Sequence, residues 1–76
     1  MRKEGDFLFF EEGTTDSRSK LGEVVVNIKY IAEITEFTHG PGIGTKFVMY
    51  RTADVFIRDT PVKEVFELIK GKGGKG

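Results

Sequence analysis

The C-terminal third of this sequence constrains the fold most, because it specifies one amphipathic helix that must lie on a sheet. Residues 61–70 follow Thr60, which we expect to be the N-cap, and Pro61 suits the first helical position, where its missing N–H costs nothing. Gly71 supplies the positive φ that ends a helix. The apolar residues recur with helical period, and those expected to face the strands are Val62, Val65, Phe66 and Ile69, with Leu68 at their border. A helix of about three turns is marginal alone, so packing must hold it.

Two segments before this helix are rich in β-branched and aromatic residues, the composition of strands. They span residues 46–50 and 54–58, and residues 51–53 between them suit a tight hairpin. The last two strands and the helix therefore follow one another closely along the chain.

Three further strands are expected upstream, over residues 6–11, 23–28 and 31–37. A helix over residues 30–36 is the competing interpretation of the third, but its Thr and Ile content and its short length favour a strand. The remaining segments are polar or rich in glycine and are expected to be connections: a loop over 12–20, a turn at 29–30, a loop over 38–45 and a flexible cationic tail over 72–76.

A chain of 76 residues forms one domain, here over residues 1–71. We expect the α+β class, mainly β: a curled antiparallel sheet of about five strands, partly barrel-like, with one C-terminal helix. A domain this small buries only about 60% of its unfolded surface. The sequence has no cysteine for a disulfide or a thiolate zinc site, so packing or self-association must supply the remaining stability.

The order of these segments resembles the small FlbD-like bacterial proteins and, less fully, part of the LytTR DNA-binding domain. The residues that carry the resemblance fall within 23–70, namely Asn27-Ile28 at a strand end, then residues 30–34, 45–49, 55–58 and 60–65. Lys63 stands where the FlbD-like helix has its first acidic residue. The resemblance implies a strand, strand, hairpin and helix arrangement, a flagellar context and no defined catalytic site, and it transfers no DNA-binding residue.

The strand at residues 6–11 is apolar on both faces, because Phe7 and Phe9 alternate with Leu8 and Phe10. One face is expected to join the core and the other to meet a partner, so these four residues are the candidate partner surface. A strand inside a closed small barrel is the alternative. We therefore expect a non-enzymatic interaction or regulatory module that self-associates, with a protein or a second copy as its partner.

A nucleic-acid-binding module is the alternative function, although a net charge of zero gives no general attraction to phosphate. Basic residues exceed acidic ones only over residues 45–76. A local patch with one aromatic residue would consist of Lys46, Tyr50, Arg51, Arg58, Lys70 and Lys72. Ordinary solubility is the competing explanation for these charges.

Residues that could suggest catalysis have simpler explanations. His39 is the only histidine and has no adjacent nucleophile or second metal ligand in the sequence. Residues 40–46 are rich in glycine, but they lack the Gly-Lys-Ser/Thr order and the following helix of a phosphate loop. The paired and alternating glutamates are typical of a solvated strand face. We expect no enzyme activity, no cofactor, no metal, no small-molecule substrate, no membrane segment and a cytoplasmic location.

Overall fold

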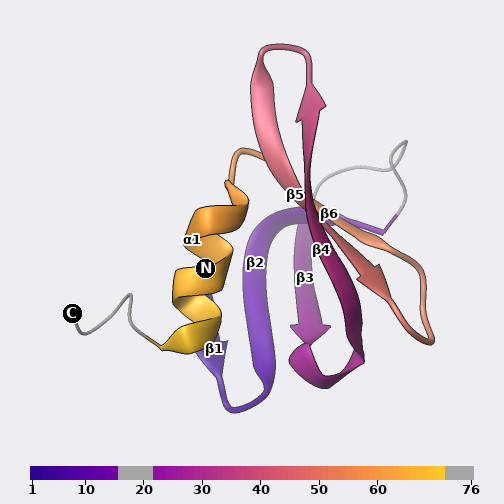
Figure 1. The fold of residues 1–76 in the computed structure, drawn as a ribbon, viewed down its shortest axis with the longest axis vertical. Helices are drawn as coiled ribbons and strands as arrows, with labels where there is room; N and C mark the ends of the chain where they lie inside the picture. The colour runs from indigo at the N-terminus through magenta and orange to yellow at the C-terminus, as the bar shows by residue number, and fades with distance from the viewer. Residues whose placement is uncertain (16–21, 72–76) are drawn as a thin grey trace.

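The computed structural model describes residues 1–15 and 22–71, and it is a single antiparallel sheet with one helix beside it (Figure 1). The expected class, mainly β with a C-terminal helix, is confirmed. The elements are β1 Arg2–Glu4, β2 Phe7–Thr14, β3 Gly22–Asn27, the 3₁₀ helix η1 Ile28–Tyr30, β4 Ile31–His39, β5 Gly42–Met49, β6 Val55–Ile57 and α1 Val62–Lys70. The tail expected at 72–76 lies outside the described residues.

Strand β2 is the centre of the sheet, because three other strands pair with it. Strand β3 follows one edge of β2 antiparallel from Phe7 to Gly13. The other edge is shared end to end by β1, which pairs with Phe7 to Phe9, and by β6, which pairs with Gly13 and Thr14. Strand β6 continues the sheet to β5 and then β4, so β3 and β4 lie at opposite ends of an open sheet.

Two connections are tighter than the sequence interpretation allowed. Strand β1 was not expected at all, yet it forms a hairpin with β2 through a two-residue turn at Gly5 and Asp6, where Gly5 has φ 61°. The loop expected over 38–45 is wrong in the same way, because β4 and β5 continue to a two-residue turn at Gly40 and Pro41. Gly40 has φ 57°. A glycine at the first central position favours such hairpin turns.

The polar loop expected from residue 12 also begins too early. Residues Glu12–Thr14 belong to β2, and the β2–β3 register shifts between Phe10 and Gly13. A shift of this kind bends a strand, and it lets the end of β2 leave β1 and reach β6. Of the expected loop, residues 16–20 lie outside the described part of the chain.

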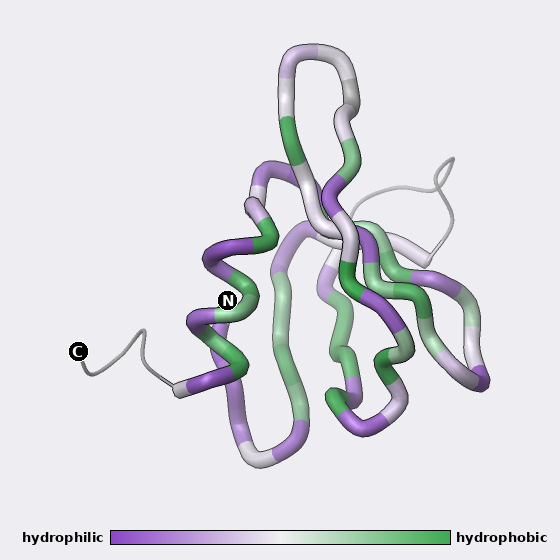
Figure 2. The backbone as a smooth tube through the Cα atoms, viewed as in Figure 1, coloured by the Kyte–Doolittle hydropathy of each residue, from purple (hydrophilic) through white to green (hydrophobic). Residues whose placement is uncertain are grey.

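The core lies between the two halves of the sheet and α1, and it consists of Leu8, Phe10, Val26, Phe47, Val55, Ile57 and Val65. Its two largest members, Phe10 of β2 and Phe47 of β5, have ring centroids 5.7 Å apart. In Figure 2, hydrophobic segments gather on the strands around this centre, while hydrophobic and hydrophilic residues alternate along α1.

Two glycines let the strands approach where β6 joins the two halves. A Cβ on Gly44 would overlap the carbonyl oxygen of Ile57 and would lie 2.7 Å from the Phe37 ring. A Cβ on Gly13 would lie 2.6 Å from a methyl carbon of Val24 and 2.7 Å from one of Ile57. Because real Cβ contacts are not this short and the contact at Gly44 includes backbone, the junction requires glycine at Gly44, whereas a larger residue at Gly13 would have to displace side-chain methyl groups.

The start of α1 differs from the expected cap. Pro61 is the N-cap residue and makes no side-chain capping bond, whereas the Thr60 hydroxyl donates to the carbonyl oxygen of Arg58 at 3.3 Å. The helix entrance is held instead by Thr45, a fully buried residue of β5. The Thr45 hydroxyl donates to the Thr60 carbonyl oxygen at 2.6 Å. At the other end Gly71 adopts the left-handed conformation with φ 78°, as expected.

The buried face of α1 is rotated relative to the expected one. Val65 is fully buried and Leu68 and Ile69 pack against the core, but Phe66 is 45% exposed. Around the helix axis, Phe66 lies about 100° to one side of Val65, whereas Leu68 lies about 60° to the other. The helix packs with the Leu68 side inward, so the expectation that Phe66 contacts the strands is wrong.

We expect Gly44→Ala to cause a large loss of stability, because it disturbs the junction where β6 joins the two halves of the sheet. The added methyl group meets backbone as well as the Phe37 ring, so the free energy of unfolding should fall by at least about 3 kcal/mol. Gly22→Ala is the matched control, because no atom lies within 4 Å of its added Cβ. Urea denaturation of both variants checks this, and equal midpoints would contradict the close approach.

Because α1 packs with its Leu68 side inward, we expect Val65 to contribute more to the free energy of unfolding than the larger Phe66. Val65→Ala should lower the free energy of unfolding by about 2 kcal/mol, because the side chain is fully buried. Phe66→Ala should cost less than about 1 kcal/mol although it removes a whole ring. Thermal and urea unfolding measure both, and a larger loss for Phe66→Ala would place the ring in the core instead.

Candidate interaction surface

The outer face of β2 carries two aromatic rings that do not belong to the core. Side chains alternate along a strand, and here Leu8 and Phe10 point inward while Phe7 and Phe9 point outward. Phe7 is 44% exposed. Of the four residues of the expected partner surface, Leu8 and Phe10 are buried core residues and are not available to a partner, so that part of the expectation is wrong.

Val25 extends this outer face onto β3. Its Cα is the register partner of Phe9, so the two side chains lie on the same side of the sheet. Val25 is 51% exposed, whereas the adjacent Val26 is buried. We call Phe7, Phe9 and Val25 the outer apolar patch. The signal that sequence reasoning missed is that Val24, Val25 and Val26 alternate between the two faces.

Charged side chains border the outer apolar patch. The Arg2 guanidinium lies 4.3 Å from the centre of the Phe9 ring, and its Nε donates to Glu4 Oε2 at 2.7 Å. This hydrogen bond raises the pKa of Arg2 above its ordinary value, and the charges of Glu4, Glu23 and Glu11 act in the same direction while partial desolvation opposes them. Arg2 therefore remains cationic over the ring, which favours a cation–π contact.

The five described residues of the expected nucleic-acid patch do not form one surface. Lys46 lies on β5, where its Nζ is 3.8 Å from Asp54 Oδ2 and 5.6 Å from the centre of the Phe56 ring. Tyr50 and Arg51 are exposed in the β5–β6 connection, and Arg58 follows the opposite end of β6.

The remaining members of the expected nucleic-acid patch lie further from β5 and β6. Lys70 is the last residue of α1, and the end of this helix lies across the molecule from the β5–β6 connection (Figure 1). Lys72 lies outside the described residues. The charges therefore have separate surroundings, and one of them, Lys46, already faces a carboxylate.

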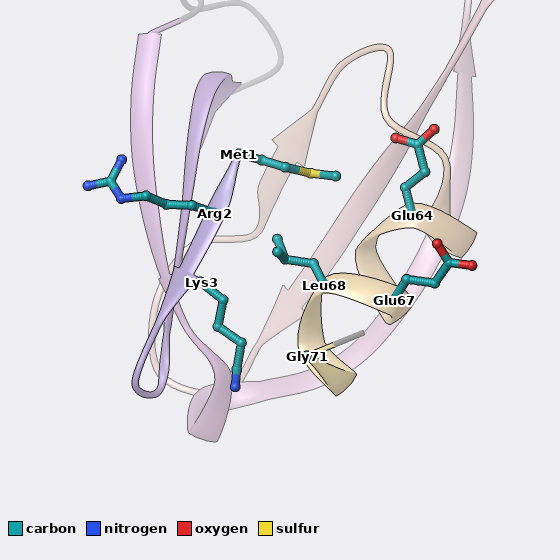
Figure 3. Close-up of a pocket in the computed structure, with 7 residues that line it drawn as sticks. All are labelled: Met1, Arg2, Lys3, Glu64, Glu67, Leu68 and Gly71. Carbon is teal, nitrogen blue, oxygen red and sulfur yellow. The ribbon is translucent and has the colours of Figure 1, made fainter. Parts of the chain in front are cut away.

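A groove of about 570 Å³ separates β1 from α1. Figure 3 shows Met1 and Leu68 pointing toward one another across it, with Glu64 and Glu67 on the helix side. Its interior is apolar and its border carries charges of both signs, since Lys3 also lines it. The groove is an open depression on the side of the helix rather than an enclosed pocket.

The other sequence candidates occupy ordinary structural positions. His39 is the last residue of β4, and the glycine-rich stretch after it forms the turn and the start of β5. Over residues 1–15 and 22–71, no three histidine or carboxylate side chains are placed to hold a metal ion. None of the described helices has the length and apolar character that a membrane crossing requires.

Comparison of the chain with protein-family models, with curated proteins and with solved structures found no match. The resemblance to the FlbD-like and LytTR families therefore stays a prediction. The functional inference must rest on the outer apolar patch and on the strands that carry it.

Proposed function

We propose that this chain is a non-enzymatic protein-interaction module that associates through its outer apolar patch, a second copy of itself included among its partners. The observation that supports this is the exposure of Phe7 and Val25, each about half accessible on the face opposite the core. Single exposed apolar side chains are common, but several of them gathered on one face of a sheet are typical of a surface that another molecule covers.

The outer apolar patch and the residues around it are arranged as in a protein–protein interface. Apolar residues lie at the centre, and Arg2, Glu4, Glu11 and Glu23 lie around them. Interfaces combine a desolvated apolar centre with a polar border, and arginine and aromatic residues are enriched in them. Arg2 over Phe9 brings both residue types together at one point.

Nucleic-acid binding is not the function we propose, because the charges expected to carry it are dispersed. Lys46 Nζ lies 3.8 Å from a carboxylate oxygen of Asp54, and the end of α1, with Lys70, lies on a different side of the molecule from the β5–β6 connection, with Arg51. Nonspecific binding of nucleic acid requires several adjacent cations.

The proposal predicts association that depends on Phe7. Sedimentation velocity from micromolar to millimolar concentration should show a sedimentation coefficient that rises with concentration. Phe7→Gln should weaken the association by at least about tenfold, because it removes a ring from the centre of the interface. Ile43→Gln is the matched control: Ile43 is 46% exposed and lies at the start of β5, away from the patch.

Each outcome decides the proposal. A monomer that does not change with concentration contradicts it. An equal loss of association in both variants contradicts it as well, because the effect would then follow general surface hydrophobicity rather than the outer apolar patch. Circular dichroism should show the same fold in the wild type and the two variants.

A further inference from the structure

Three strands have an edge that no other described strand pairs with: β1, β3 and β4. Such an edge offers free backbone N–H and C=O groups to another chain. Strand β1 is short and its three residues are all charged, which discourages pairing. Strand β4 carries Glu33 and Glu36 and no lysine or arginine, so two copies of it would bring like charges together.

Strand β3 lacks these protections. Its centre is Val24, Val25 and Val26, without proline or lysine, and its register with β2 is regular from Val24 to Asn27. Unbroken runs of β-branched residues at an edge favour the addition of another strand.

One hydrogen bond at the end of β3 shows which of its residues turn their backbone N–H and C=O groups toward β2. The Ile28 N–H donates to the carbonyl oxygen of Asp6 at 2.8 Å, so Ile28 faces β2. In an antiparallel ladder successive residues face opposite edges. Val26 and Val24 therefore also face β2, whereas the N–H and C=O groups of Asn27, Val25 and Glu23 face away from it.

From this we infer that a second copy of the chain pairs antiparallel with β3 about a two-fold axis through Val25. This goes beyond the proposed function, because the pairing joins two copies at the edge of the sheet and leaves Phe7 and Phe9 on its outer face. In this register Val25 lies opposite Val25 of the second copy, and Glu23 lies opposite Asn27 of the second copy. Every residue in these pairs presents its backbone groups to the shared edge, so the register satisfies the free groups of both strands.

Side-chain charge and shape favour the same arrangement. Glu23 lies at the start of β3 and Lys29 just past its end, so antiparallel pairing brings Glu23 of each strand near Lys29 of the other, twice. Within one chain Lys29 Nζ lies 3.5 Å from Asp6 Oδ2, and because this pair is exposed, Glu23 of the second copy would join it. The two Val25 side chains contact one another on the outer face. The contact at Val25 is self-complementary, as two-fold symmetry requires, and the two outer apolar patches then lie side by side on one continuous sheet.

The first experiment places charges on the two-fold axis. Val25→Lys and Val25→Glu should each weaken self-association by at least about tenfold, because each puts like charges opposite one another. An equimolar mixture of the two variants should associate again, since the charges are then opposite. Ile43→Lys, at a site of similar exposure, should associate as the wild type does.

The second experiment observes the edge directly. Amide hydrogen exchange by NMR should show the Val25 amide exchanging faster than the Val24 and Val26 amides in dilute monomer. It should become protected as concentration rises, while the Val24 and Val26 amides change little.

The outcomes separate the two proposals. Association that weakens with Phe7→Gln but is unaffected by either Val25 variant would overturn pairing through β3 and leave the proposed function standing. A Val25 amide that stays unprotected in the associated state would overturn it as well. A protein that never associates overturns both.

Discussion

The rest of the structure depends on the close pairing of β6 with β2 on one side and with β5 on the other. Only three residues of β6 are in strand conformation, yet they join the β1–β2–β3 half of the sheet to the β4–β5 half. The approach is possible because Gly13 and Gly44 leave no side chain between the strands. The Phe37 ring covers the space above Gly44 and also meets Phe56 edge-on, with ring centroids 5.5 Å apart. An aromatic ring over a strand glycine replaces the side-chain contacts that glycine cannot make.

The helix is attached to the same junction. The buried Thr45 hydroxyl holds the Thr60 carbonyl immediately before α1, so the direction of the helix is set by β5 and not by a cap of its own. Asp59 reaches this point with φ 58°, a conformation that aspartate tolerates better than most residues. With its start fixed in this way, α1 directs Val65 and Leu68 inward and leaves Phe66 at the surface.

Sequence periodicity was sufficient to predict the helices and strands whose two faces differ in polarity. The helix over 62–70, its stop at Gly71 and the central strands follow from local pattern. The inward face of β2 does not, because a run of Phe7 to Phe10 is apolar in either orientation and only its pairing with β1 and β3 decides which residues are buried. Likewise, Gly40-Pro41 was interpreted as part of a loop and Asp6 as the start of a strand, although Gly40-Pro41 and Gly5-Asp6 each form a two-residue hairpin turn.

The candidate site shows the same division between local and long-range information. The shared face of Phe7 and Phe9 could be expected from the sequence, whereas the contribution of Val25 required the β2–β3 register. The expected basic patch failed as one surface because it grouped residues that are near in sequence, while the topology turns β6 and α1 in different directions. Side chains gather on a surface according to strand order, which local composition does not specify.

The Phe10–Phe47 pair has a consequence for how the molecule unfolds. One ring comes from each half of the sheet, and the other core residues of the strands are likewise divided between β2–β3 and β5–β6, while α1 adds Val65. Neither half encloses a hydrophobic centre of its own, so separating them exposes both sets of side chains to water at once. The domain should accordingly melt in a single all-or-none transition, with no half-folded species in which one hairpin pair outlives the other.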